Sequence, residues 1–186
     1  TLKTATRALA QADLVVVDGE ALRTHGGSLR VFARPSISAG SPSATVAKVL
    51  ADEATLGLHT LEGHDGFAAE VFRIKRDLLR FLLDAKAEGK TVAGYGAPGK
   101  GNTLLNHCGI RADLLPYTTD RSTYKHNMLL PGTHIPILAP EVLAERRPDY
   151  ILILPWNLRE EIAEQLSYAR ERGAKFVVPI PELTVF

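Results

Sequence analysis

The second half of the chain alternates short apolar runs with segments of helical periodicity. The apolar runs predict four strands, over residues 91–95, 115–119, 150–155 and 175–178. The periodic segments predict helices over about 102–108, 140–147 and 158–172. Right-handed crossovers between parallel strands place the second strand on one side of the first and the third on the other. The pattern therefore predicts an α/β fold, a Rossmann-like parallel sheet of order 2-1-3-4 with flanking helices.

The first third of the chain carries a different pattern. The segments TLKTATRALAQA, DLVVVDGE and SLRVFAR predict the end of a helix followed by two strands of a hairpin, which is too small to be stable alone. The segment PSISAGSPS marks a linker, and Ser43 is the expected N-cap of a helix over about 44–56. A long amphipathic helix over 67–88 leads into the sheet. We expect three parts, with boundaries at 1–35, 36–66 and 67–186.

Composition narrows the class of protein. The 186 residues are 45% hydrophobic and 23% charged, and 22 basic against 21 acidic residues give a net charge of +1. That balance offers no electrostatic footprint for nucleic acid or an anionic membrane. Cys108 is the single cysteine, so an internal disulfide and a cysteine-based zinc site are excluded, and a cytoplasmic setting fits. The chain starts at Thr1 inside a helical pattern, from which we expect a fragment of a longer protein.

A glycine-rich turn follows the first strand of the predicted sheet. Gly94, Gly96 and Gly99 form G-x-G-x-x-G between a strand and a helix, and Asp120 ends the next strand 26 residues after Gly94. This arrangement is typical of dinucleotide-binding folds, where a phosphate meets the helix start and an acid holds ribose hydroxyls. The alternative is a tight turn in a parallel sheet that binds nothing.

Unusual residues follow three of the strands, in GAPGKGN, DRSTYKHN and PWN. Because the carboxyl ends of parallel strands share one edge, we expect these segments to meet in one crevice. The candidate substrate-binding residues are Gly94, Tyr95, Gly96, Pro98, Gly99, Lys100, Asn102, Asp120, Arg121, Tyr124, Lys125, His126, Trp156 and Asn157.

Each of these side chains also has a plain structural interpretation. Lys100 could neutralise a phosphate or be solvated, and Asp120 could hold ribose or cap a turn. Trp156 could stack on a base or fill the core, whereas Asn157 is expected to cap the following helix. Arg121, Tyr124, Lys125 and His126 suit phosphate and base contacts or an ordinary loop. No residue is assigned a catalytic role. His25, beside two glycines, could be a base or a turn residue.

Longer strings carry a family resemblance. LRTHGGSLRV, GYGAPGKGNTLLNHCGI, YTTDRSTYKHNMLLPGTHIPI, RPDYILILPWNLREEI and GAKFVVPIPEL resemble the C-terminal domain of S-adenosylmethionine-dependent sugar C-methyltransferases, which act on nucleotide-linked keto-deoxysugars. The resemblance covers nearly the whole chain from about Asp18. It implies a parent protein with an N-terminal zinc domain, a central S-adenosylmethionine-binding catalytic domain, and a Rossmann-like C-terminal domain that holds a dTDP-type nucleotide sugar.

In that scheme residues 1–35 are the terminal helix and hairpin of the methyltransferase domain. The chain lacks the family's zinc-ligand cysteines, its donor-binding glycine loop with a preceding acid, and its Glu-His pair. We therefore expect no cofactor in this chain and no methyl transfer by it alone. The partners implied are the nucleotide-linked sugar and the missing domains. Two alternatives remain: a stand-alone NAD(P)-binding Rossmann oxidoreductase domain, and a structural or oligomerisation domain without a ligand.

Overall fold

The computed structural model describes residues 1–22 and 24–186, and the side chain of His25 lies outside the described part. The chain forms two compact units, Thr1–Ala68 and Ala69–Phe186. The predicted division at 35/36 and 66/67 stays a prediction. No helix among the described residues has the length and apolarity needed to cross a membrane.

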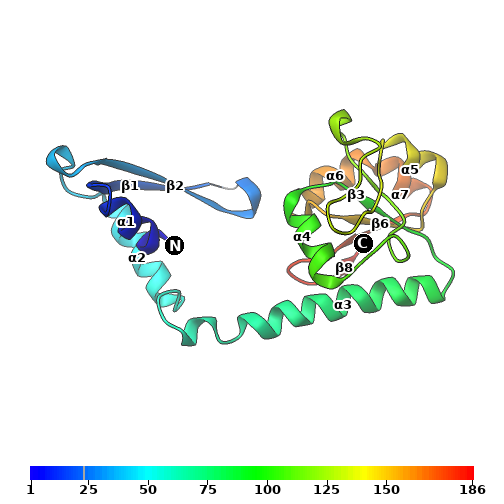
Figure 1. Ribbon diagram of the computed structural model, residues 1–186, viewed down its shortest axis with the longest axis horizontal. Helices are drawn as coiled ribbons and strands as arrows, with labels where there is room; N and C mark the ends of the chain where they lie inside the picture. The colour runs from blue at the N-terminus through cyan, green and yellow to red at the C-terminus, as the bar shows by residue number, and fades with distance from the viewer. Residues whose placement is uncertain (23) are drawn as a thin grey trace. The chain divides into compact units, whose positions relative to one another are not determined.

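The first unit is a two-stranded antiparallel hairpin covered by two helices (Figure 1). Its elements are α1 (Leu2–Ala10), β1 (Leu14–Leu22), β2 (Ser28–Pro35) and α2 (Ala44–Thr55), with 3-10 turns η1 (Thr24–Gly26), η2 (Ser36–Ser38) and η3 (Glu62–His64). Leu2, Val16 and Val46 form its small core, so the helix predicted within the linker segment packs against the hairpin.

Two polar contacts tie this unit together. Ser43 is the N-cap residue of α2, as predicted, although its hydroxyl donates to Asp18 Oδ1 at 2.5 Å and caps no helical N–H. The Glu53 carboxylate accepts from the N–H groups of Leu2 and Lys3 at the start of α1 and contacts His59 Nε2 at 3.0 Å. Both contacts join segments that are distant in sequence.

The second unit is a six-stranded sheet between two layers of helices. Its helices are α3 (Phe67–Ala87), which begins just before the unit boundary, α4 (Gly99–Cys108), α5 (Glu141–Arg146), α6 (Arg159–Gln165) and α7 (Ser167–Glu171). Its strands are β3 (Val92–Tyr95), β4 (Thr118–Thr119), β5 (Ile137–Leu138), β6 (Tyr150–Ile153), β7 (Lys175–Val178) and β8 (Thr184–Val185). The order is β5-β4-β3-β6-β7-β8, parallel except for β8.

Alternate residues of the strands face opposite layers, as the two-residue period of a strand requires. On β6, Leu152 packs with α3 and α4, whereas Ile151 and Ile153 pack with α5, α6 and α7. Both sets are fully buried. This two-sided burial explains why the run YILILP is apolar throughout.

The predicted Rossmann-like fold is confirmed, and β4-β3-β6-β7 is the expected 2-1-3-4 order. The two-residue strands β5 and β8, at the sheet edges, were not predicted. The helix predicted over 158–172 is divided at Leu166 into α6 and α7, after the 3-10 turn η5 (Trp156–Leu158). A further 3-10 turn, η4 (Thr123–Lys125), lies in the loop after β4.

Candidate functional site

The polar segments that follow β4 and β6 each contact the segment that follows β3. The N–H of Ala97, after β3, donates to Asp120 Oδ2 at 2.6 Å. Lys100 contacts Trp156 and Asn157, which follow β6. The expected convergence at the carboxyl edge of the sheet is therefore present. Which of these residues touch a substrate stays a prediction.

Two glycines of the fingerprint are required by the packing of the fold. A Cβ on Gly94 would lie 2.6 Å from Thr118 Oγ1 on the adjacent strand. Gly96 has φ +87°, and a Cβ there would lie 2.6 Å from both Cγ and Cδ of Pro155. Because the neighbours already demand glycine, neither residue is evidence for a ligand.

Gly99 is different. It is the first residue of α4, it is exposed, and a Cβ on it would meet nothing within 4 Å. Pro98 occupies the N-cap position and supplies no side-chain acceptor, which leaves the first N–H groups of α4 available to a ligand. Gly101 behind it is buried, with Leu154 Cβ 2.8 Å from the position of its missing Cβ, so close packing against Leu154, just after β6, holds this helix end in place.

Asp120 clamps the glycine turn to the loop after β4. Its carboxylate accepts from the N–H of Ala97 at 2.6 Å, the N–H of Ser122 at 2.8 Å and Lys125 Nζ at 3.1 Å. Lys125 Nζ also donates to the carbonyl of Ala97 at 3.1 Å, so both polar groups of Ala97 are held. Burial opposes ionisation, but these donors outweigh it and lower the pKa of Asp120. Because both carboxylate oxygens have protein partners, these contacts favour the interpretation of Asp120 as a residue that holds the turn.

The Lys100 side chain contacts Trp156 and Asn157, in the segment after β6. Its Nζ donates to Asn157 Oδ1 and sits 4.5 Å from the centre of the Trp156 ring, a cation–π contact. Burial lowers the pKa of this ammonium group. The expectation that Asn157 caps the next helix is wrong, because α6 begins at Arg159 with Leu158 as its N-cap residue. Trp156 also packs against the hydrophobic core on both faces of the sheet. Filling the core and stacking on a ligand are therefore compatible roles for this side chain.

The other predicted site residues lie on α4 and in the loop after β4. Asn102 accepts from Asn106 Nδ2 within α4. The His126 ring contacts the carbonyl of Asp120 at 2.7 Å, and Tyr124 is 88% exposed in the same loop. His126 therefore supports the loop after β4, whereas Tyr124 stands free in solvent.

A pocket of about 500 Å³ opens beside the turn, on the face covered by α5 to α7. Tyr95 and Arg121 line it, and the polar residues among its other lining residues, which the sequence did not indicate, are Glu141, Gln165 and Tyr168. The Tyr95 hydroxyl donates to Gln165 Oε1 at 3.3 Å, and burial raises the pKa of Tyr95, so this group stays a donor. Gln165 and Tyr168 reach the pocket from either side of the helix break at Leu166, and the continuous helical pattern gave no sign of that break.

Among the described residues, no group of three or more His, Cys, Asp or Glu side chains is placed to hold a metal ion. The arrangement offers cations, uncapped N–H groups and aromatic surface. It is thus suited to holding an anionic ligand with a ring system.

Comparison with known proteins agrees with the resemblance in the sequence. Residues 23–181 match the model of the family described as "C-methyltransferase C-terminal domain". The chain belongs to this family. The match begins inside the segment 1–35.

A curated relative of this C-methyltransferase C-terminal domain is C-methyltransferase NovU from Streptomyces niveus. It is 39% identical over 169 residues, which cover 91% of this chain and 40% of NovU. The chain thus spans less than half the length of that relative. A solved structure, UDP-D-quinovosamine 4-dehydrogenase from Vibrio fischeri, is 19% identical, covers 52% of this chain and 93% of its own, and has a TM-score of 0.39.

Proposed function

We propose that this C-methyltransferase C-terminal domain binds the nucleotide-linked sugar on which its parent enzyme acts. The observation that carries the proposal is the open helix start at Gly99 beside Lys100, to which the segments after β4 and β6 converge. The diphosphate would sit at the first N–H groups of α4, and Lys100 would neutralise part of its charge. The pocket beside Tyr95 and Arg121 would hold an adjoining part of the ligand.

Membership of this family supports a nucleotide-linked sugar as the substrate. The choice of sugar and nucleotide is our own proposal. We propose a dTDP-linked keto-deoxysugar, with S-adenosylmethionine and zinc held by parts of the parent enzyme that precede this domain. In such a reaction a base would remove a proton beside a ketone, and the resulting carbon nucleophile would take the methyl group as its bond to the sulfonium sulfur breaks and the neutral thioether leaves. This chain's residues would bind and orient the sugar nucleotide for that attack. A cytoplasmic setting is part of the same proposal.

The hydrogen bonds of Asp120 argue against the NAD(P) alternative. An acid at the end of the second strand usually accepts from ribose hydroxyls, but the Asp120 carboxylate already accepts from Ala97, Ser122 and Lys125. Its side chain is only 13% exposed. A dinucleotide site would need the Asp120 carboxylate to bind ribose, but the hydrogen bonds that hold the glycine turn already occupy it.

Isothermal calorimetry with a panel of nucleotides tests the proposal. We expect thymidine diphosphate to bind more tightly than NAD, NADP or S-adenosylmethionine, because a diphosphate suits the start of α4. Tighter binding of S-adenosylmethionine would contradict the proposal. Tighter binding of NAD or NADP would favour the oxidoreductase alternative, and no binding of any compound would favour a structural domain.

Lys100→Met should weaken thymidine diphosphate binding by about 10- to 100-fold, since a hydrogen bond to a charged group contributes roughly 1.5–3 kcal/mol. Lys175→Met is the matched control, because Lys175 is exposed at the start of β7, the opposite edge of the sheet. Calorimetry of both variants, with a thermal melt of each, separates binding from folding. Equal affinities for the two variants would remove Lys100 from the site.

A further inference from the structure

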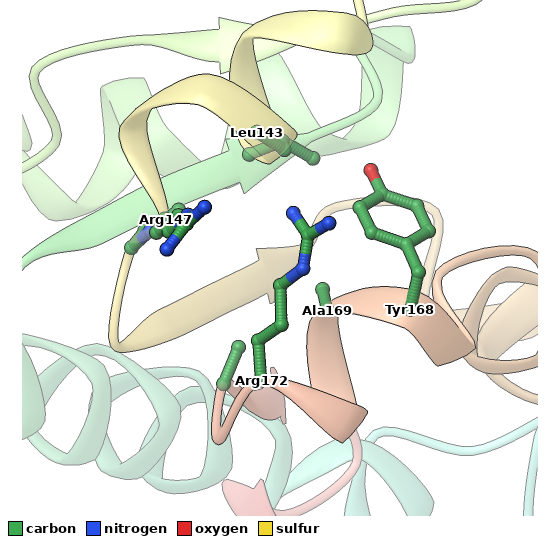
Figure 2. A pocket seen from close by; sticks show the side chains of 7 residues that line it. Leu143, Arg147, Tyr168, Ala169 and Arg172 are labelled. Carbon is green, nitrogen blue, oxygen red and sulfur yellow. The ribbon is translucent and has the colours of Figure 1, made fainter.

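Lys100 is a cation at a place where its own helix does not favour one. It is the second residue of α4, and the start of a helix carries a partial positive charge that repels an ammonium group. Arg147 and Arg172 show the usual placement, because they end α5 and α7 as C-cap residues, where a cation complements the helix dipole (Figure 2). The needs of the helix therefore do not explain Lys100.

The charge of Lys100 is held in place but not cancelled. The side chain is partly buried, and among the described residues Lys100 takes part in no salt bridge. The Asn157 side-chain oxygen and the Trp156 ring, which it contacts, are both neutral. A carboxylate in either place would hold the ammonium group and neutralise it. Because an ammonium group has three N–H donors and Asn157 accepts from one, donors remain for a ligand.

The segment that holds Lys100 is itself packed against the glycine turn. Pro155 lies against Gly96, with two ring carbons 2.6 Å from the position of the missing Cβ. Leu154 lies against Gly101 in the same way, at 2.8 Å. Asn157 follows directly, in the 3-10 turn η5. Its acceptor oxygen is therefore presented from a segment that the packing already fixes to the turn and to the start of α4.

We propose that Asn157, with the Trp156 ring as a wall, positions Lys100 to bind the phosphate groups of the ligand while leaving its charge intact. A free lysine loses rotamer freedom when it meets an anion, whereas a lysine that is already held does not lose that freedom again. Asn157 is thus a positioning residue that acts on the ligand only through Lys100. This role rests on the proposed function of the chain, and it gives the reason for an amide at this position.

A double-mutant cycle tests this role, with thymidine diphosphate as the probe in calorimetry. Asn157→Leu removes the acceptor at nearly the same side-chain size and should weaken binding about 3- to 10-fold. In the Lys100→Met background the same change should weaken binding less than about twofold, because a positioning residue has no effect once its target is gone. Equal losses in both backgrounds, as a purely structural role would give, or full affinity in Asn157→Leu would overturn the role of Asn157.

Asn157→Asp keeps the acceptor and adds a counter-charge. It should weaken binding about tenfold and make the affinity less dependent on salt, since the neutralised pair attracts the diphosphate less. Gln11→Glu makes the same amide-to-acid change at an exposed residue of the first unit and should bind as the unaltered chain does. Equal losses in these two variants would show a general charge effect and reject the role. Unchanged affinity in Asn157→Asp would reject it as well.

The result for the unaltered chain separates this role from the proposed function. If the unaltered chain does not bind thymidine diphosphate, the proposed function is wrong and the role of Asn157 falls with it. If it binds and the losses in the cycle are additive, the nucleotide site stands and only the role of Asn157 is wrong. A thermal melt of each variant separates a loss of binding from a loss of folding.

Discussion

Gly96→Val should destabilise the Rossmann-like unit by about 2–5 kcal/mol, from roughly 1–2 for a left-handed residue with a Cβ and 1–3 for overpacking. The strain arises from φ +87° and from Pro155, whose ring carbons would lie 2.6 Å from the new Cβ. Urea unfolding followed by the fluorescence of Trp156, the single tryptophan, measures the loss. Unchanged stability would mean that the turn can rearrange without Gly96.

Gly99→Val is the matched control for the same turn. Nothing lies within 4 Å of the Cβ position, so we expect stability to change by less than about 0.5 kcal/mol, as at most surface positions. Thymidine diphosphate binding should nevertheless fall more than tenfold, because the branched side chain would occupy the approach to the α4 N–H groups. If Gly99→Val keeps full affinity, the start of α4 is not the diphosphate site.

Asp120→Ala should cost about 2–4 kcal/mol of stability, since it leaves two N–H groups and Lys125 without their shared acceptor. The pKa of Asp120 lies below its ordinary value of 3.8, so the stabilisation is present above about pH 4 and is lost as the pH falls further. Urea unfolding between pH 3 and pH 7 should therefore show a flatter acid limb in the variant.

Asp113→Ala is the control for that loss, because Asp113 is exposed in the loop after α4. It should change stability by less than about 0.5 kcal/mol. If Asp120→Ala instead keeps its stability and loses only nucleotide affinity, the carboxylate faces the ligand, and the ribose interpretation of Asp120 would return.

The strand order and the convergence of the three polar segments could be predicted because both follow from local patterns and the handedness of crossovers. The contact partners of individual side chains could not be predicted from the sequence. Asn157 is the residue type expected at a helix start, yet it accepts from Lys100, which is 57 residues away. Gly96 matched a phosphate-binding motif, but the reason for glycine is a proline 59 positions later. Such contacts depend on how the elements pack, and sequence spacing does not contain them.

Short elements were missed for a related reason. β5 and β8 have two residues each, too few to show a two-residue period, and they are strands because a neighbour pairs with them. The helix break at Leu166 lies within an apolar stripe that stays continuous, so the sequence pattern gave no sign of it. Gln165 and Tyr168 are ordinary helix residues in that pattern, and nothing marked them as pocket residues.

The lengths of the edge strands bear on self-association. The six-stranded sheet ends in β5 and β8, each two residues long, which offer little open backbone to another chain. The hairpin has strands of nine and eight residues that pair only with each other among the described residues. Their outer edges are therefore largely open, apart from the Val17 carbonyl, which accepts from the N–H of Ser43. Aggregation of this chain through strand addition should therefore start from the first unit, and shielding or charging those edges is the change that would keep it in solution.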